Sequence, residues 1–178
     1  VVDATGRGSR AGTWLAELGY ERPREEGLDT ATVYVTRNYR RRPGDAPFSG
    51  AFMGPSPQAP YGGFVIAVED DRWMAVLLGV GPGQAPPTDP DGYLAFTRKL
   101  SGPELSDLLG RAEPLEAPKR LRLPASVRRR YETLARVPEG FLAFGDALCA
   151  FNPSYAQGMT VAAVQATVLR ECLRAGRD

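Results

Sequence analysis

Histidine is absent from this sequence of 178 residues, and its absence excludes several chemistries within the chain. Neither a Ser-His-Asp nor a Cys-His catalytic arrangement can be built without an imidazole. Zinc sites that use histidine ligands are excluded for the same reason. Cysteine is scarce too, because Cys149 and Cys172 are the only two and form no CxxC pattern. This usage is typical of a reduced, cytoplasmic protein with two free, buried cysteines.

Excess charge and long apolar runs are also lacking. The chain has 22 Lys and Arg against 21 Asp and Glu, which gives no electrostatic reason to expect nucleic acid or a membrane surface as a partner. No apolar run approaches the ~18 residues that a membrane span needs, and no signal peptide is visible. We interpret the runs Arg40–Arg42 and Arg128–Arg130 as solvated faces, with an anion contact as the alternative.

The pattern of residues predicts an α+β fold. Alternation of β-prone residues predicts strands over 30–41, 63–69, 72–80, 119–124 and 141–144, with Asp70 and Asp71 turning a hairpin. Helical patterns and caps predict helices over 14–20, 91–100, 103–110, 126–134 and 157–175. Residues 42–61 hold many prolines and glycines, which predicts a long loop. We therefore expect a mainly antiparallel middle sheet and a closing strand-loop-helix piece of an α/β domain.

The stretch GDALCAFNPSYAQGMT, residues 145–160, carries the strongest indication of a ligand site. Asp146 follows the strand predicted over 141–144, at the edge where open α/β sheets bind ligands. Its carboxylate suits sugar or ribityl hydroxyls because it accepts hydrogen bonds. Gln157, Gly158 and Met159 begin the last helix, where free amides and the macrodipole favour electron-rich groups. Gly158 allows a close approach because it has no Cβ. The alternative is that Gly145-Asp146 is a simple turn.

Two segments carry a resemblance to a known family. Residues 141–163 resemble the second FAD-binding motif of flavoprotein monooxygenases of the para-hydroxybenzoate hydroxylase type. VDATGRGS, residues 2–9, resembles the strand-loop that precedes the substrate domain in that family. The segment FNPSYAQGMTVAA, residues 151–163, and the predicted strand YVTRNYR, residues 34–40, look closest to a bacterial branch of this family that includes polyether epoxidases. The resemblance covers essentially the whole chain.

The resemblance implies roles for named residues. Gly145 and Asp146 form the Gly-Asp pair, with Asp146 at the ribityl or diphosphate region of the flavin. Pro153, Gln157, Gly158 and Met159 would lie along the isoalloxazine ring. Gly6 and Arg7 would lie near the diphosphate. Ala156 stands where this branch usually has glycine.

A second departure is the missing dinucleotide fingerprint GxGxxG, which should precede this region. The first residue is Val1, and the chain opens on what looks like the end of a strand. We therefore expect a C-terminal piece of a longer protein, whose N-terminal FAD-domain half lies in the same gene or in a separate chain. The isolated chain should bind FAD weakly or not at all and be inactive.

The resemblance also implies a domain division and a reaction. Residues 1–28 and 125–178 would be the remnant of the FAD-binding domain, and 29–124 the substrate-binding domain. The intact enzyme would use FAD, NAD(P)H and O₂ to hydroxylate or epoxidise a small organic substrate. Candidates for the substrate wall, with core packing as the alternative, are Phe48, Phe52, Tyr61, Phe64 and Trp73. Tyr34 and Tyr39 are candidates to face the flavin.

Three other functions stay open from the sequence. One is a flavin-dependent reductase resembling the geranylgeranyl reductases, which share the Gly-Asp motif and saturate double bonds. Another is a non-catalytic remnant that has lost its cofactor. The third is a nucleotide-sugar or small-acid binding module, with a phosphate contact at the helix start near residue 157.

Overall fold

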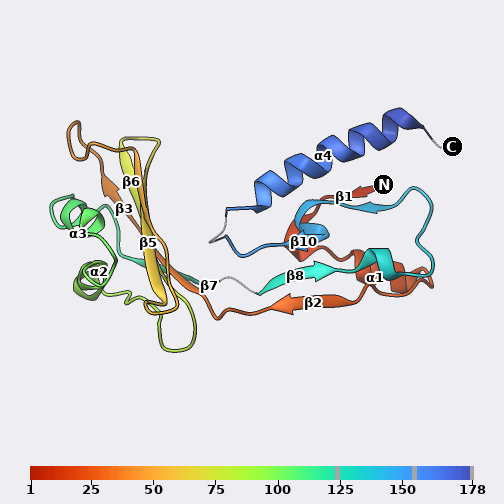
Figure 1. Ribbon diagram of the computed structural model, residues 1–178, viewed down its shortest axis with the longest axis horizontal. Helices are drawn as coiled ribbons and strands as arrows, with labels where there is room; N and C mark the ends of the chain where they lie inside the picture. The colour runs from red at the N-terminus through yellow and green to blue at the C-terminus, as the bar shows by residue number, and fades with distance from the viewer. Residues whose placement is uncertain (123–124, 154–155, 177–178) are drawn as a thin grey trace. The chain divides into compact units, whose positions relative to one another are not determined.

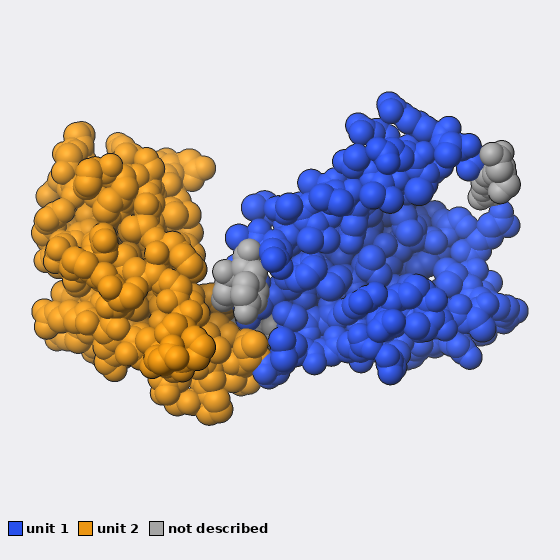
Figure 2. Space-filling model, viewed as in Figure 1, with its two compact units in different colours: residues 1–29, 124–178 blue, residues 30–123 orange. Residues whose placement is uncertain are grey.

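The chain divides into two compact units. The computed structural model describes residues 1–122, 125–153 and 156–176. Unit 1 comprises residues 1–29 and 124–178, and unit 2 comprises residues 30–123 (Figure 2). The assignment of these units to a FAD-binding and a substrate-binding domain stays a prediction.

Unit 2 is built on a five-stranded antiparallel sheet with the order β4-β5-β6-β3-β7. Its strands are β3 (Val33–Arg40), β4 (Gly50–Met53), β5 (Tyr61–Val68), β6 (Arg72–Gly79) and β7 (Lys119–Arg122). The predicted hairpin is confirmed: Asp70 and Asp71 both have positive φ, 59° and 49°, in the left-handed region that Asp tolerates better than most residues.

The prediction of a continuous loop over 42–61 was wrong, because β4 lies inside it. Phe52 of β4 is paired with Phe64 of β5, and the strand is only four residues long. Pairing with the free edge of β5 decides the conformation here, and the local proline and glycine content does not report on it.

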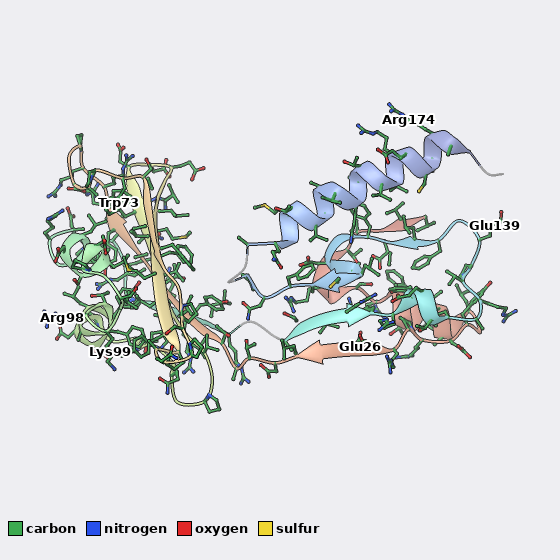
Figure 3. All side chains as sticks on the ribbon, viewed as in Figure 1. Glu26, Trp73, Arg98, Lys99, Glu139 and Arg174 are labelled. Carbon is green, nitrogen blue, oxygen red and sulfur yellow. The ribbon has the colours of Figure 1, made fainter. Side chains whose placement is uncertain are left out.

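Two helices, α2 (Pro90–Thr97) and α3 (Glu104–Leu109), cover one face of this sheet (Figure 1). Asp89 caps α2, because its carboxylate accepts a hydrogen bond from the Gly92 amide at 2.7 Å, and α3 ends at Gly110. The core between helices and sheet uses the odd-numbered strand positions, including Val35, Tyr39, Val65, Trp73, Ala75 and Leu77, with Tyr93, Leu105 and Leu108 from the helices. Trp73 is labelled on β6 in Figure 3.

The opposite face of the sheet carries the even-numbered positions. Strand register places five of them in one row across the sheet, in the order Phe52, Phe64, Val76, Thr36 and Lys119. The row changes from aromatic at β4 to polar and charged at β7. This face is therefore amphipathic along the direction perpendicular to its strands.

Unit 1 contains two small sheets. Strand β1 (Val2–Asp3) pairs in parallel with β9 (Leu142–Ala143). The second sheet is antiparallel with the order β10-β8-β2, and its strands are β2 (Glu25–Leu28), β8 (Ser126–Arg129) and β10 (Cys149–Ala150). The helix predicted over 126–134 was therefore wrong. Ser126–Arg129 is a strand because it has a pairing partner on each side, and only a 3₁₀ turn, η2 (Tyr131–Thr133), follows it.

Two helices and two further 3₁₀ turns complete unit 1. They are α1 (Ala11–Glu17), α4 (Gly158–Ala175), η1 (Gly6–Gly8) and η3 (Gly145–Ala147). Gly19, with φ of 80°, follows the end of α1 as predicted. The predicted last helix is confirmed as α4, but none of its described residues is buried. No helix in the part of the chain that the structure describes has the length and hydropathy needed to cross a membrane.

Candidate functional site

Asp3 organises the first of the two predicted cofactor loops. It is the last residue of β1 and is buried. Its carboxylate accepts hydrogen bonds from the Thr5 amide at 3.1 Å, the Thr5 hydroxyl at 2.6 Å and the Ser9 hydroxyl at 2.5 Å. Burial raises the pKa of Asp3, but the hydrogen bonds from Ser9 and Thr5 outweigh burial and the net pKa is lowered. An ionised Asp3 therefore holds the η1 turn.

Gly6 and Arg7, both predicted near the flavin diphosphate, lie in that turn. Gly6 has φ of 82°, and a Cβ built on it would meet no atom within 4 Å, so its backbone faces open space. The Arg7 guanidinium donates to the carbonyls of Ala125 at 2.6 Å and Phe151 at 2.9 Å. The backbone of η1 is thus accessible to a ligand, while the Arg7 side chain ties the turn to the β8 and β10 segments.

Gly145 and Asp146 form the η3 turn directly after β9. Gly145 adopts φ of 58°, a conformation that favours glycine. Its amide donates to the Gln165 side-chain oxygen at 2.7 Å, which fixes the turn against the second turn of α4. The Asp146 carboxylate lies next to Gly158, where Oδ1 is 3.7 Å from the position that a Cβ would occupy. Gly145, Asp146 and Gly158 are therefore brought together as predicted from the sequence.

The start of α4 is open. Gly158 is its first residue and Gln157 its N-cap, without a capping side chain, and Met159 is 85% exposed. The Val161 amide donates to the Gln157 carbonyl at 2.9 Å in this first turn. An eighteen-residue helix thus begins without a capping hydrogen bond from the side chain of its N-cap residue.

Ala156 precedes this helix in a left-handed conformation. Its φ is 49°, and its amide donates to the carbonyl of Pro153 at 2.9 Å. A left-handed residue with a Cβ costs roughly 1–2 kcal/mol relative to glycine. The departure from glycine at this position therefore has a physical consequence within the chain itself, which is backbone strain in the loop that leads to α4.

Arg129 is a residue that the sequence interpretation missed. Its side chain is 12% exposed, so the prediction of a solvated face is wrong for this member of the Arg128–Arg130 run. It donates to the carbonyls of Ala147 at 3.0 Å and Arg7 at 3.1 Å, and pairs with the Glu25 carboxylate at 2.8 Å. Its guanidinium thus hydrogen-bonds to both the η1 and the η3 turn.

The arrangement fits the flavin half of FAD. It offers the Asp146 carboxylate beside the start of α4, Gly158 without a Cβ at that start, and Gly6, whose backbone faces open space in the η1 turn. These groups suit ribityl hydroxyls, an electron-rich ring and a phosphate respectively. The sequence holds no GxGxxG unit that would hold the adenine half.

The aromatic candidates in unit 2 separate into two groups. Trp73 is 1% exposed in the core, Phe48 packs on it with ring centroids 6.1 Å apart, and Tyr61 packs edge-on against Phe96. Tyr39 is also buried in this core. The second group is Tyr34, Phe52 and Phe64; Phe52 is 62% exposed, whereas Tyr34 is buried in a small cluster with Val76 and Leu78. Only this second group lies on the sheet face opposite the helices.

An apolar groove of about 330 Å³ lies between α4 and the segment around β9, lined by Leu142, Phe144, Val164, Val168 and Leu169. Val164 and Val168 are each more than half exposed, although they lie on the apolar side of the helix. The adjacent β1–β9 sheet is parallel and has two strands, whereas parallel sheets normally have both faces covered. Both cysteines are free; Cys149 is half-buried, and Cys172 is exposed, contrary to prediction.

This chain has the fold of part of the flavin-dependent halogenases and related flavoproteins. The flavin-dependent brominase Bmp2 superposes with a TM-score of 0.62 at 20% identity, covering 99% of this chain and 44% of the brominase. HpxO of Klebsiella pneumoniae, solved with FAD and uric acid, superposes with a TM-score of 0.61 at 20% identity, covering 99% and 43%. The expected resemblance and the α+β fold are confirmed.

One relative is closer in sequence. Protein Rv3254 of Mycobacterium tuberculosis is 37% identical over 175 residues, which are 98% of this chain and 37% of the relative. No protein-family model matches the sequence. This chain spans less than half the length of each of these three proteins.

Proposed function

We propose that this chain is part of a FAD-dependent oxidoreductase in which unit 1 holds the flavin. The observation that carries the proposal is the Asp146 carboxylate beside the Cβ-free, uncovered start of α4. The fold shared with flavin-dependent enzymes supports it. When bound, the flavin would supply the redox chemistry, taking electrons from NAD(P)H and using O₂ to oxygenate a substrate.

The chain's own residues would bind and orient the cofactor. The Asp146 carboxylate would accept hydrogen bonds from ribityl hydroxyls. The amide end of α4 would stabilise negative charge on the ring by about 0.3–2 kcal/mol. Pro153, Gln157 and Met159 would lie along the ring, and the Gly6 backbone would approach the diphosphate. Arg7 would contribute its backbone, because its guanidinium is engaged with two carbonyls.

Unit 2 would supply the wall for a small organic substrate. The sheet face opposite the helices presents Phe52, Phe64, Ile66 and Met74 on β4, β5 and β6, all at least partly exposed. Such a surface suits the apolar part of a substrate. Thr36 and Lys119, at the polar end of the cross-strand row, suit a hydrogen-bonding group of the same substrate. Trp73, Phe48, Tyr61 and Tyr39 would support this wall from the core and would not contact the substrate.

The adenine half of FAD would be held by a further α/β segment, in the same polypeptide or in a second chain. The exposed residues Val2 and Leu142 of the parallel pair β1–β9 and the exposed apolar side of α4 are the surfaces that such a segment would bury. The shares of 37–44% that this chain covers in its relatives leave room for it there.

The test is an FAD titration on two polypeptides. One is this chain alone, and the other is a chimera in which this chain replaces the matched 175 residues of the M. tuberculosis relative. We expect weak binding by the chain alone and a yellow, stoichiometric complex with the chimera. The unmodified relative, purified in parallel, is the control for cofactor loading. A chimera that folds yet stays colourless after incubation with FAD would sink the proposal.

The reaction type is tested on the loaded chimera. Oxygen consumption coupled to a hydroxylated or epoxidised product is the expected result for a monooxygenase. Saturation of a substrate double bond without oxygen uptake would instead support the reductase alternative.

A further inference from the structure

Arg129 occupies the centre of unit 1. It lies on β8, the middle strand of the β10-β8-β2 sheet, directly across from Glu25 of β2. Its side chain leaves the sheet on the same face as Glu25 and forms an ion pair with it at 2.8 Å. The other donors of the guanidinium point to the turns described above.

The same guanidinium hydrogen-bonds to both predicted cofactor turns. On the η1 side it donates to the carbonyl of Arg7 at 3.1 Å. On the η3 side it donates to the carbonyls of Ala147 at 3.0 Å and Asp146 at 3.5 Å. A planar guanidinium has five N–H donors in a fixed fork, so one side chain can bond to both turns at once.

Its neighbours in the sequence cannot do this. Arg128 lies on the opposite face of β8, is 55% exposed at its side chain, and pairs with Glu132. Arg130 pairs with Glu26 and Glu132. Of the three consecutive arginines, the strand register directs only Arg129 toward η1 and η3.

We propose that Arg129 is a positioning residue that fixes the η1 and η3 turns in the relative arrangement that receives the flavin. The inference rests on the proposed function, because it assumes that Gly6 and Asp146 bind the same cofactor and must be held at a fixed separation. Arg129 would act through the backbone of these turns and would not touch the cofactor. Arg129 binds only backbone carbonyls of the two turns, which leaves the Asp146 carboxylate for the ligand.

The test compares Arg129→Lys with the matched control Arg128→Lys. Lysine keeps the charge next to Glu25 but replaces the fork by a single ammonium, which cannot hold both turns with the same geometry. Amide hydrogen exchange in this chain should become faster at residues 145–148 in Arg129→Lys and stay unchanged in Arg128→Lys. In the chimera, Arg129→Lys should raise the Kd for FAD about tenfold or more and alter the visible circular dichroism of the bound flavin.

The outcomes separate the two proposals. If neither the wild-type chimera nor the Arg128→Lys chimera binds FAD, the proposed function itself falls, and the positioning role falls with it. If both bind FAD and Arg129→Lys binds it with the same Kd and the same dichroism, only the positioning role is overturned. Global unfolding of Arg129→Lys in the thermal melt also overturns it, because Arg129 would then hold the whole of unit 1.

Discussion

The Asp146 carboxylate and Gly158 face each other, with Oδ1 3.7 Å from where a Cβ on Gly158 would lie. That separation is an ordinary van der Waals contact, so the protein itself has room for a methyl group. We therefore expect Gly158→Ala to fold normally and to weaken FAD binding, because the methyl group would occupy the space through which a flavin ring approaches. Gly158→Val should weaken it further.

The measurement is the FAD content of each purified chimera, with its thermal melt. Gly12→Ala is the matched control, since a Cβ there would also make an ordinary contact, with Pro23 Cδ at 3.6 Å, and Gly12 has no assigned cofactor contact. Wild-type flavin content in Gly158→Val would contradict the close approach.

Asp146 should be needed for cofactor binding and dispensable for folding. Its side chain is half-buried on a 3₁₀ turn that is held through backbone groups, by Gln165 at the Gly145 amide and by Arg129 at the carbonyls. Asp146→Ala removes the acceptor and leaves those bonds in place. We expect FAD occupancy to fall sharply, with a change in unfolding free energy within about 0.5 kcal/mol. Full occupancy after gel filtration of Asp146→Ala would rule out the role given to this carboxylate.

The parts of the fold that were predictable from the sequence are those with local signals. α4 has a clear helical periodicity, α2 has the Asp89 cap followed by Pro90, and the β5–β6 hairpin has eight-residue strands around a turn. Each of these elements forms from neighbouring residues. The strands β2, β4, β8 and β10 have two to four residues each and exist through pairing with distant segments, which leaves little periodicity to read.

The candidate site shows the same division. The junction of Asp146 with the start of α4 was predictable, because a strand, a Gly-Asp pair and a glycine at a helix start follow in order along the chain. The role of Arg129 was not, because three arginines in a row look alike until the register with β2 and β10 assigns a face to each. The division of the aromatic residues between core and open face likewise depends on strand parity, which a sequence fixes only when strand boundaries are known.

Ala156→Gly should stabilise unit 1. Ala156 has φ of 49°, and relief of this strain is worth roughly 1–2 kcal/mol, against a loss of about 0.5–1 kcal/mol for the added backbone freedom of glycine. We expect a net gain of up to about 1 kcal/mol in the free energy of unfolding. Urea unfolding followed by Trp14 fluorescence in a Trp73→Phe background reports on unit 1, because Trp14 is the one remaining tryptophan.

The matched control is Ala166→Gly, an exposed position inside α4, where glycine should cost about 1 kcal/mol. If both glycine substitutions destabilise the unit to the same extent, Ala156 is not strained.

Asp3 should make the stability of unit 1 depend on acid pH. Its folded pKa is lowered, because hydrogen bonds from Ser9 and Thr5 outweigh the raising effect of burial. A group with a lowered folded pKa contributes stability above its unfolded pKa, about 3.9, and that stability is lost as pH falls toward the folded value. We expect Asp3→Asn to lower the free energy of unfolding by about 1–3 kcal/mol at pH 7, and the difference from wild type to shrink below about pH 4.

Ser9→Ala keeps the Asp3 carboxylate and removes one of its hydrogen-bond donors. The free energy of unfolding of this variant should therefore begin to fall with acid at a higher pH than that of wild type. Parallel pH profiles for wild type and Asp3→Asn, measured by the same Trp14 fluorescence, would show that the carboxylate of Asp3 contributes no ionisation-linked stability.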